Sequence, residues 1–328
     1  MPDEILIAGL GTTGSSIARS LRQAKLAVGL VGYDPHPKVA REALKAKVVD
    51  RTIGDLGEVP AECDLCILSL DPGEMIPALE SLAPRLAEGS LVISTSPVQV
   101  PIMAWCAEHL PAGRSYIGAV PVTGASAVAE EPEASSGHGR FAGGVMALVT
   151  PHGTPQSAID VAASLARIVG AHAFFLDPAE LDAATAATDE LPILLAAALM
   201  NMSARQPGWR DARRLAASAF AGGTALLADL DAQQTAGAMN LNRASLSVKL
   251  DALLSELGEW RAALGSGDDE GLTRRISDAA QARAVWIHAR RMGDWEAEEM
   301  RAAPPVEGPS ALERMFGLGR TKGNAGRK

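Results

Sequence analysis

The sequence predicts an α/β protein whose first half forms a doubly wound parallel sheet and whose second half is entirely helical. Between residues 5 and 176, short apolar runs alternate with segments of helical pattern, which is the rhythm of consecutive β-α-β units. After about Asp177 the chain becomes alanine-rich, and strand-like runs almost disappear. The first apolar run, residues 5–8, passes directly into a glycine-rich turn and a helical segment, so the strand–turn–helix order is set early in the chain.

Eight apolar runs in the first half have the length of buried strands and are bounded by turn residues. A stretch rich in Gly, Ser and Glu, residues 124–139, interrupts the alternation and predicts a loop. We therefore expect a first domain over residues 1–176. Its strands are expected at 5–8, 27–32, 47–49, 65–70, 91–94, 116–119, 145–150 and 173–176, and its helices include 15–24, 37–46, 74–86 and 155–169.

The second half predicts a helical domain over residues 177–300. Several of its long helices carry apolar faces, which suggests burial between subunits as well as within one and predicts a homodimer. The segment 301–328 is rich in Gly, Lys and Arg and predicts a disordered basic tail. The helices are expected at 178–188, 191–204, 209–219, 223–234, 239–265 and 268–292.

Composition narrows the class of protein. The 328 residues are enough for two cores, and a net charge of −9 argues against a nucleic-acid partner. The chain starts at its first strand, so no signal peptide is expected. The longest apolar run, residues 191–202, is too short to span a membrane. The chain has only three cysteines. Together with the absence of an expected signal peptide or membrane span, this low number predicts a cytoplasmic protein.

Cys63 and Cys66 form a C-x-x-C pattern, which occurs in metal and redox sites. A structural zinc site needs four ligands, and only one further cysteine, Cys106, is present. Alternation along the predicted strand 65–70 is expected to point the two thiols to opposite faces. We therefore expect small buried side chains here and no metal site.

The glycine-rich turn has the spacing G-x-G-x-x-G. In a strand–turn–helix unit, Gly9 permits the tight turn, Gly11 lets the backbone approach a pyrophosphate, and Gly14 lets the helix pack close to the strand. Free N–H groups at the start of the helix then face the phosphates. The spacing therefore predicts dinucleotide binding, with Leu10, Thr12 and Thr13 as the other residues of the turn.

Asp34 ends the second predicted strand, about 20 residues beyond the glycines. A carboxylate there accepts hydrogen bonds from the adenosine ribose hydroxyls and disfavours a 2′-phosphate, which favours NAD. His36 and Lys38 lie close by and are able to face a phosphate, so NADP stays open as a second cofactor. Leu70, at the end of the fourth predicted strand, is also expected to contact the cofactor.

The order of these segments resembles the prephenate and arogenate dehydrogenases, which join an N-terminal Rossmann domain to an all-helical dimerisation domain. The similarity extends from about residue 4 to about residue 291. Its most specific part is Gly-Trp-Arg-Asp-Ala-Arg-Arg at residues 208–214, similar to the family's glycine-aromatic-Arg-Asp-x-x-Arg segment. The resemblance implies that Arg214 binds a substrate carboxylate. The other segments that carry it are residues 5–14, 31–34, 116–124 and 189–192.

The chain departs from this family at the positions that touch the substrate. The family usually has His-Pro where this chain has Val120-Pro121, and valine neither accepts nor donates a proton. A second family histidine falls on Glu190. The family's Ser-x-Lys after the fifth strand appears here without its lysine, at residues 94–98.

Four residues are candidates for the chemistry. Ser96 and Thr123 carry hydroxyls able to bind the substrate or the nicotinamide amide. His138 lies in the loop that follows Val120 and is either a group that folds over the substrate or an exposed loop histidine. Glu190 could replace the family's histidine as a polar contact, but its carboxylate would repel an anionic substrate unless it were protonated or paired.

We therefore expect a homodimeric NAD(P)-dependent oxidoreductase of the prephenate and arogenate dehydrogenase type. Its substrate is expected to be a small cyclohexadienyl anion that undergoes oxidative decarboxylation. One alternative is a dehydrogenase of another hydroxy acid on the same scaffold. A second alternative is a dinucleotide-binding protein that has lost catalysis. Val120, in place of the family's histidine, and the missing lysine favour this alternative.

Overall fold

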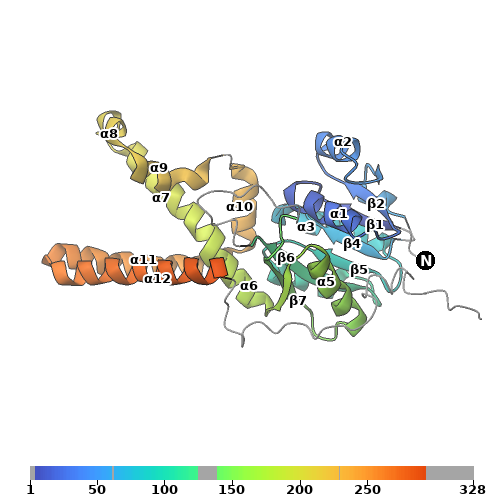
Figure 1. Cartoon of the computed structure of the whole chain (residues 1–328). Helices are drawn as coiled ribbons and strands as arrows, with labels where there is room; N and C mark the ends of the chain where they lie inside the picture. Colours follow the sequence, from blue (N-terminus) through green and yellow to red (C-terminus); the bar gives the residue numbers. More distant parts are fainter. Residues whose placement is uncertain (1–3, 61–62, 125–138, 229, 293–328) are drawn as a thin grey trace, which may run out of the picture. The chain divides into compact units, whose positions relative to one another are not determined.

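The computed structural model describes residues 4–60, 63–124, 139–228 and 230–292 (Figure 1). The chain divides into two compact units. Unit 1 comprises residues 1–178 and 281–328, and unit 2 comprises residues 179–280. The predicted tail 301–328 and most of the predicted loop 124–139 lie outside the described residues.

Unit 1 is built on one eight-stranded sheet with the order β3-β2-β1-β4-β5-β6-β7-β8. Neighbouring strands are parallel except β6 and β7, which pair antiparallel from Gly118↔Val149 to Val122↔Val145. The predicted doubly wound parallel sheet is confirmed, and this one antiparallel pair was not foreseen. The strands are β1 (Glu4–Ala8), β2 (Gly29–Tyr33), β3 (Arg51–Thr52), β4 (Leu65–Leu68), β5 (Leu91–Ser94), β6 (Ser115–Val122), β7 (Val145–Val149) and β8 (His172–Phe175).

Helices cover the sheet because its central strands are apolar on both faces. Ile5 and Ile7 of β1 lie fully buried in one core cluster, with Ile17 of α1 and Leu165 of α5. On the other face, Ser94 of β5 hydrogen-bonds the sulfur of Met75 in α3. The helices of unit 1 are α1 (Thr12–Gln23), α2 (Pro37–Lys45), α3 (Pro72–Leu82), α4 (Val100–His109) and α5 (Gln156–Ile168).

One local feature moves a strand from its predicted place, and one helix was not among those predicted. Lys47 adopts a left-handed backbone conformation, with φ of 55°, so the chain turns where residues 47–49 were expected to form a strand. The strand β3 starts only at Arg51. Helix α4 follows β5 and begins with Pro101 in its first turn, a position that proline tolerates.

The described part of unit 2 consists of helices and the turns that join them, and its last helix, α12, continues into residues 281–292, which belong to unit 1. Two of the predicted helices were wrong in extent: the segment 209–219 breaks after Leu215, and most of 223–234 lies outside a long helix. Helices α11 and α12 are joined at Gly267, whose φ of 68° suits a helix C-terminus. The elements are α6 (Pro178–Thr185), a π-helical turn (Ala186–Glu190), α7 (Leu191–Arg205), α8 (Trp209–Leu215), α9 (Ser218–Thr224), α10 (Ala232–Leu241), α11 (Arg243–Ser266) and α12 (Asp269–Met292).

One continuous helical stretch, Pro178–Arg205, is long and apolar enough by length and composition to cross a membrane. Length and composition alone are weak evidence for a membrane span, because core helices of water-soluble proteins meet the same two criteria. The stretch also contains the buried ionisable side chains of Asp182 and Glu190, which are costly in a bilayer.

Candidate functional site

The glycine turn between β1 and α1 is shaped by contacts that only glycine permits. Gly9 has a φ of 88°, and a Cβ there would lie 2.1 Å from the carbonyl oxygen of Ser69. A Cβ at Gly14 would lie 1.9 Å from the carbonyl oxygen of Gly9. At Gly11 nothing lies within 4 Å of the added atom. The first and third glycines therefore pack α1 onto the strand, and the second faces open space.

The start of α1 has the features of an anion-binding position. Its N-cap is Gly11, which offers no side chain to the first-turn N–H groups. Those of Thr12 and Thr13 have no acceptor within the helix, because the first turn of any α-helix lacks one. A helix start also carries partial positive charge. The turn is thus built to receive a phosphate.

Asp34 follows β2 and lies beside this turn. Its Oδ2 accepts a hydrogen bond from the Leu10 N–H at 2.8 Å, and its Oδ1 accepts one from the His36 N–H at 2.8 Å. The side chain is only 6% exposed, and the imidazole of His36 lies 3.4 Å away. Each carboxylate oxygen has further lone pairs, so Asp34 is fixed in place and still able to accept from a ribose hydroxyl.

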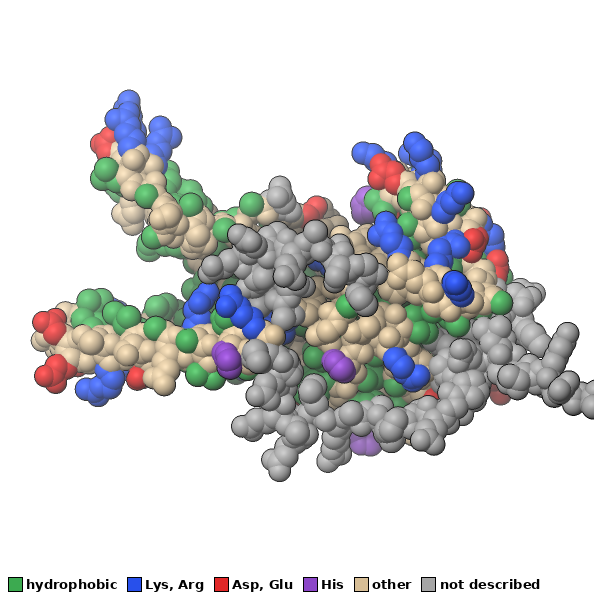
Figure 2. Space-filling view, viewed as in Figure 1, with side chains coloured by type: hydrophobic (Ala, Val, Ile, Leu, Met, Phe, Trp, Pro, Cys, Tyr) green, Lys and Arg blue, Asp and Glu red, His purple; other side chains and the backbone are tan. Residues whose placement is uncertain are grey.

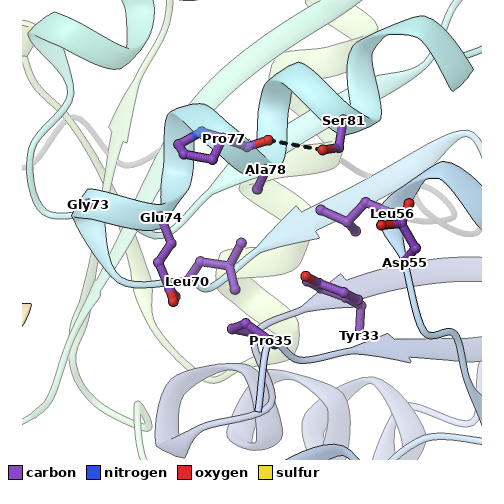
Figure 3. Close-up of a pocket in the computed structure, with 10 residues that line it drawn as sticks. All are labelled: Tyr33, Pro35, Asp55, Leu56, Leu70, Gly73, Glu74, Pro77, Ala78 and Ser81. Atoms are coloured by element: carbon purple, nitrogen blue, oxygen red, sulfur yellow. Dashed lines mark hydrogen bonds between the residues drawn. The ribbon is translucent and has the colours of Figure 1, made fainter. Parts of the chain in front are cut away.

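A pocket of about 250 Å³ is lined by Tyr33 and Pro35, the chain neighbours of Asp34 (Figure 3). The side chains of Tyr33, Leu56 and Leu70 point toward one another across it. Burial raises the pKa of the Tyr33 phenol, and the negative charges of Asp55, Glu74 and Asp34 add to the rise. An apolar slot with acidic surroundings suits an uncharged purine and a free ribose more than a 2′-phosphate. The residues present therefore fit NAD.

The end of β5 presents two hydroxyls with different surroundings. Ser96 is 1% exposed, and its hydroxyl donates to the Val98 carbonyl at 3.1 Å. Gln99 donates in turn to the Ser96 carbonyl. The Ser96 hydroxyl thus belongs to a buried turn. The Thr95 hydroxyl instead donates to Ser69 Oγ at 3.0 Å, next to the glycine turn.

The candidates around β6 are only partly described. Val120 is 8% exposed and pairs with Ala147 of β7 inside the sheet. Thr123 follows the strand, and its carbonyl accepts a hydrogen bond from Arg290. His138 lies outside the described residues.

Unit 2 holds one buried carboxyl group with an unusual environment. Glu190 is 5% exposed, and its Oε2 accepts a hydrogen bond from Asn242 Nδ2 at 2.9 Å. Asn242 also donates to the Asp182 carbonyl at 3.0 Å. Glu190 Oε1 has no partner, the only such buried side-chain nitrogen or oxygen in the described part of the chain. Glu190 also ends a π-helical turn, a feature frequent at functional sites.

Burial raises the pKa of Glu190 to about 7. The Asn242 hydrogen bond opposes the rise, whereas the nearby charges of Asp182 and Asp189 add to it. Burial also raises the pKa of Asp189. Glu190 is therefore largely neutral below neutral pH, and a neutral carboxyl group does not repel an anion.

Arg214 lies exposed on the short helix α8. Figure 2 shows the basic side chains of this helix gathered at its surface. Among the described residues, Arg214 has no ion-pair partner within 4.0 Å. Its guanidinium is thus available to an anionic ligand.

Asn242, which binds Glu190, was not singled out from the sequence, and neither were Ser69 and Thr95 beside the glycine turn. Asn242 lies 52 residues from Glu190, so no local pattern joins them. Thr95 follows directly on the predicted strand 91–94, and that position was the available signal. Ser69 lay inside the predicted strand 65–70, whereas β4 ends at Leu68.

The C-x-x-C pair lies where β4 begins. Cys63 precedes β4, so strand alternation does not set the direction of its side chain, and its thiol donates to the Leu65 carbonyl at 3.4 Å. The interaction between the two thiols lowers the pKa of Cys63 and raises that of Cys66. Both are buried and free, and the described residues contain no group of three side chains able to hold a metal ion.

Comparison with known proteins gives consistent matches. The family model described as "Prephenate dehydrogenase, nucleotide-binding domain" matches residues 17–175. The prephenate dehydrogenase of Bacillus subtilis is 24% identical over 287 residues, covering 86% of this chain and 76% of that protein. The cyclohexadienyl dehydrogenase of Zymomonas mobilis is 25% identical over 293 residues, covering 85% of this chain and 94% of that protein.

Solved structures match over the same extent. Prephenate dehydrogenase from Aquifex aeolicus, in complex with hydroxyphenyl propionate and NAD+, has a TM-score of 0.76 at 19% identity. The match covers 86% of this chain and 97% of that one. Arogenate dehydrogenase from Synechocystis has a TM-score of 0.70 at 20% identity, covering 86% and 99%. At these identities the likeness shows the fold.

The glycine turn predicts opposite outcomes for two substitutions. Gly11→Ala has room in the protein, so we expect an unchanged melting temperature and at least tenfold weaker NADH binding, because the methyl group blocks the approach of the pyrophosphate. In Gly14→Ala the added methyl group would clash with the Gly9 carbonyl oxygen, so we expect a lower melting temperature. Thermal unfolding and NADH fluorescence titration measure both. An unstable Gly11→Ala protein would contradict the assignment.

The raised pKa of Glu190 predicts a pH-dependent stability. Burial disfavours the charged carboxylate of Glu190 in the folded protein. The folded protein is therefore most stable below about pH 4.5, where this group is neutral in both the folded and the unfolded state. It loses that stability as the pH rises through about 7. Glu190→Gln should therefore unfold like the wild type at pH 5 and be more stable at pH 8.5 by up to about 3 kcal/mol. Urea denaturation measures this.

The control for that series is Asp251→Asn, which removes an exposed carboxyl group from α11. It should change the free energy of unfolding equally little at both pH values. A Glu190→Gln protein with the same stability difference at pH 5 and pH 8.5 would show that Glu190 is ionised throughout.

Proposed function

This chain belongs to the prephenate and arogenate dehydrogenase family, and we propose that it is an NAD-dependent dehydrogenase that decarboxylates a cyclohexadienyl substrate oxidatively. The observation that carries the proposal is the fit of the glycine turn to a dinucleotide. Gly14 packs α1 against Gly9, Gly11 faces open space, and Asp34 stands beside an apolar pocket. This arrangement supports a pyrophosphate at the helix start and an adenosine next to Asp34.

A dinucleotide held at Gly11 and Asp34 would supply the acceptor for a hydride from the carbon that carries the substrate hydroxyl. As that hydride leaves, the bond to the ring carboxylate breaks, carbon dioxide departs and its electron pair completes the aromatic ring. The reaction therefore needs no strong base. The protein must bind the substrate's carboxylates and hold a hydrogen-bonding group near the hydroxyl.

In unit 2, Arg214 and Glu190 are our candidates for these tasks. Arg214 supplies a guanidinium suited to a carboxylate. Glu190, largely neutral below pH 7, offers a hydrogen bond without repelling an anion. Arogenate carries an ammonium group, so an ionised Glu190 would favour arogenate over prephenate.

We also propose that the protein is a cytoplasmic homodimer. Figure 2 shows hydrophobic side chains spread over α11 and α12. Val248, Leu254 and Leu264 of α11 are each more than half exposed, and a second copy would remove such apolar surface from water. Three buried free cysteines suit a reducing compartment.

A second candidate is a dinucleotide-binding protein without catalysis. Val120 favours it, because a buried strand valine occupies the place of the family's histidine. The test is NADH formation by the purified protein with prephenate, arogenate and a 3-hydroxy acid. It distinguishes the proposed dehydrogenase from both alternatives. Turnover of prephenate or arogenate supports the proposal. Turnover of the hydroxy acid alone, or NADH binding without any turnover, would overturn it.

Replacement of Arg214 tests the substrate site. Arg214→Ala should raise the Michaelis constant of the active substrate by about 10- to 100-fold, because a charge-assisted contact to a carboxylate is lost. The Michaelis constant of NAD should stay the same. Arg213→Ala removes the neighbouring exposed guanidinium of α8 and serves as the control. Equal effects of the two variants would remove Arg214 from the site.

A further inference from the structure

Strand β6 extends beyond the end of its neighbour β5. The last pair between the two strands is Ser94↔Gly118, and β6 continues from there to Val122. The extension pairs with β7, and this ladder ends at Val122↔Val145. Because β6 runs parallel to β5, the extension rises from the carboxyl edge of the sheet, where doubly wound folds bind their ligands.

Two glycines hold the end of this extension in place. A Cβ at Gly124 would lie 2.7 Å from the Ala142 carbonyl oxygen, and one at Gly144 would lie 2.1 Å from the Val122 carbonyl oxygen. The backbone around Thr123 is therefore packed against the chain that leads into β7. Thr123 lies one residue past the ladder, so its carbonyl group has a fixed position outside the strand pairing.

Arg290 reaches this carbonyl group from the end of α12. Residues 281–292 of the helix belong to unit 1, so the contact lies within one compact unit. Arg290 Nη2 donates a hydrogen bond to the Thr123 carbonyl oxygen. Basic residues are common in the last turn of a helix, and the neighbouring Arg291 is exposed there. Arg290 instead is partly buried and turns onto the sheet.

The guanidinium of Arg290 keeps most of its donors. A guanidinium carries five N–H groups, and the bond to Thr123 uses one of them. Within the described part of the chain, no carboxylate lies within 4.0 Å of Arg290. A fixed, planar set of donors with its positive charge is therefore left for a ligand.

The carboxyl edge of the sheet has no cation of its own at the ends of its central strands. The segments that follow β1, β4, β5 and β6 contain no Lys or Arg, and Asp71 adds negative charge. Among the described Lys and Arg side chains, Arg290 alone hydrogen-bonds a residue just past the carboxyl end of a strand. An anion at this edge therefore depends on the cation that α12 supplies. The segments are residues 9–14, 69–71, 95–99 and 123–124.

The reaction of a cyclohexadienyl substrate calls for a cation away from the cofactor. The hydride leaves from the ring carbon that carries the hydroxyl, which must face the nicotinamide. The carboxylates are attached at the opposite end of the ring, so they point away from the cofactor. The extension of β6 carries Arg290 in that direction, past the end of β5. The ring carboxylate leaves as carbon dioxide, and a cation bound to it would oppose that departure.

We propose that Arg290 is a substrate-binding residue whose guanidinium, held by the Thr123 carbonyl group, binds the side-chain carboxylate that stays on the product. The inference rests on the proposed function, because that reaction supplies the ligand. Arg290 touches the substrate, and Thr123 is the positioning residue, which acts through its backbone.

Two analogues of the product distinguish a bound charge from a structural contact. 3-(4-Hydroxyphenyl)propionate carries the side-chain carboxylate alone, and 3-(4-hydroxyphenyl)propan-1-ol replaces it with an uncharged hydroxyl group. In the NADH-loaded full chain, Arg290→Gln should weaken propionate binding by about tenfold, the value of one charge-assisted hydrogen bond. Binding of the alcohol should stay within about twofold, because glutamine still offers the Thr123 carbonyl a donor. Calorimetry measures both.

Two further variants and the kinetics complete the series. Arg290→Lys keeps the charge and should bind the propionate within about threefold of the wild type. Arg291→Gln removes the neighbouring exposed guanidinium and should change neither affinity. Arg290→Gln should also raise the Michaelis constant of the active substrate by about tenfold with little change in kcat, because this carboxylate is bound alike before and during the reaction.

Three binding results would overturn the inference. They are unchanged propionate affinity in Arg290→Gln, equal loss of propionate and alcohol affinity in that variant, and equal effects of Arg290→Gln and Arg291→Gln. Normal turnover of prephenate or arogenate with an unchanged Michaelis constant in Arg290→Gln would refute the role of Arg290 alone. A wild type that binds the propionate through Arg290 but turns over no cyclohexadienyl substrate would refute the proposed function alone.

Discussion

The contact between Gly14 and the Gly9 carbonyl is the constraint on which the cofactor site depends. A side-chain carbon at Gly14 would lie 1.9 Å from that oxygen, so the helix α1 is able to sit on β1 only because both residues are glycine. This packing puts the free N–H groups of α1 at the crevice between β1 and β4. It also brings Leu10 within hydrogen-bonding distance of Asp34 and places Ser69 against the turn.

The parts of the fold that local pattern encodes were predictable. Strand β5 has the bounds expected from its apolar run, and β1 differs by one residue. The antiparallel pairing of β6 with β7 was not predictable, because an apolar run has the same pattern whichever way the strand runs. The start of β3 depends on a left-handed residue at Lys47, a conformation that lysine rarely adopts. Helix ends in unit 2 depend on packing more than on propensity.

The same division holds for the site. The glycine spacing describes a backbone shape, so a short motif was enough to place the turn and Asp34. The pairing of Glu190 with Asn242 joins residues 52 positions apart, which no spacing rule reaches. Ser96 was predicted as a hydroxyl contact, and its hydroxyl is bound to the Val98 carbonyl inside the turn after β5, which the order of residues alone does not reveal.

The bond between Asn242 and Glu190 also constrains how this chain varies. Asn242 spans two acceptors, the Asp182 carbonyl and Glu190 Oε2, and all three residues are buried. Loss of the amide alone leaves a buried carboxyl group without any partner, and loss of the carboxyl group alone leaves an amide proton unused. Positions 190 and 242 are therefore expected to change together in descendants of this chain, by paired rather than single substitutions.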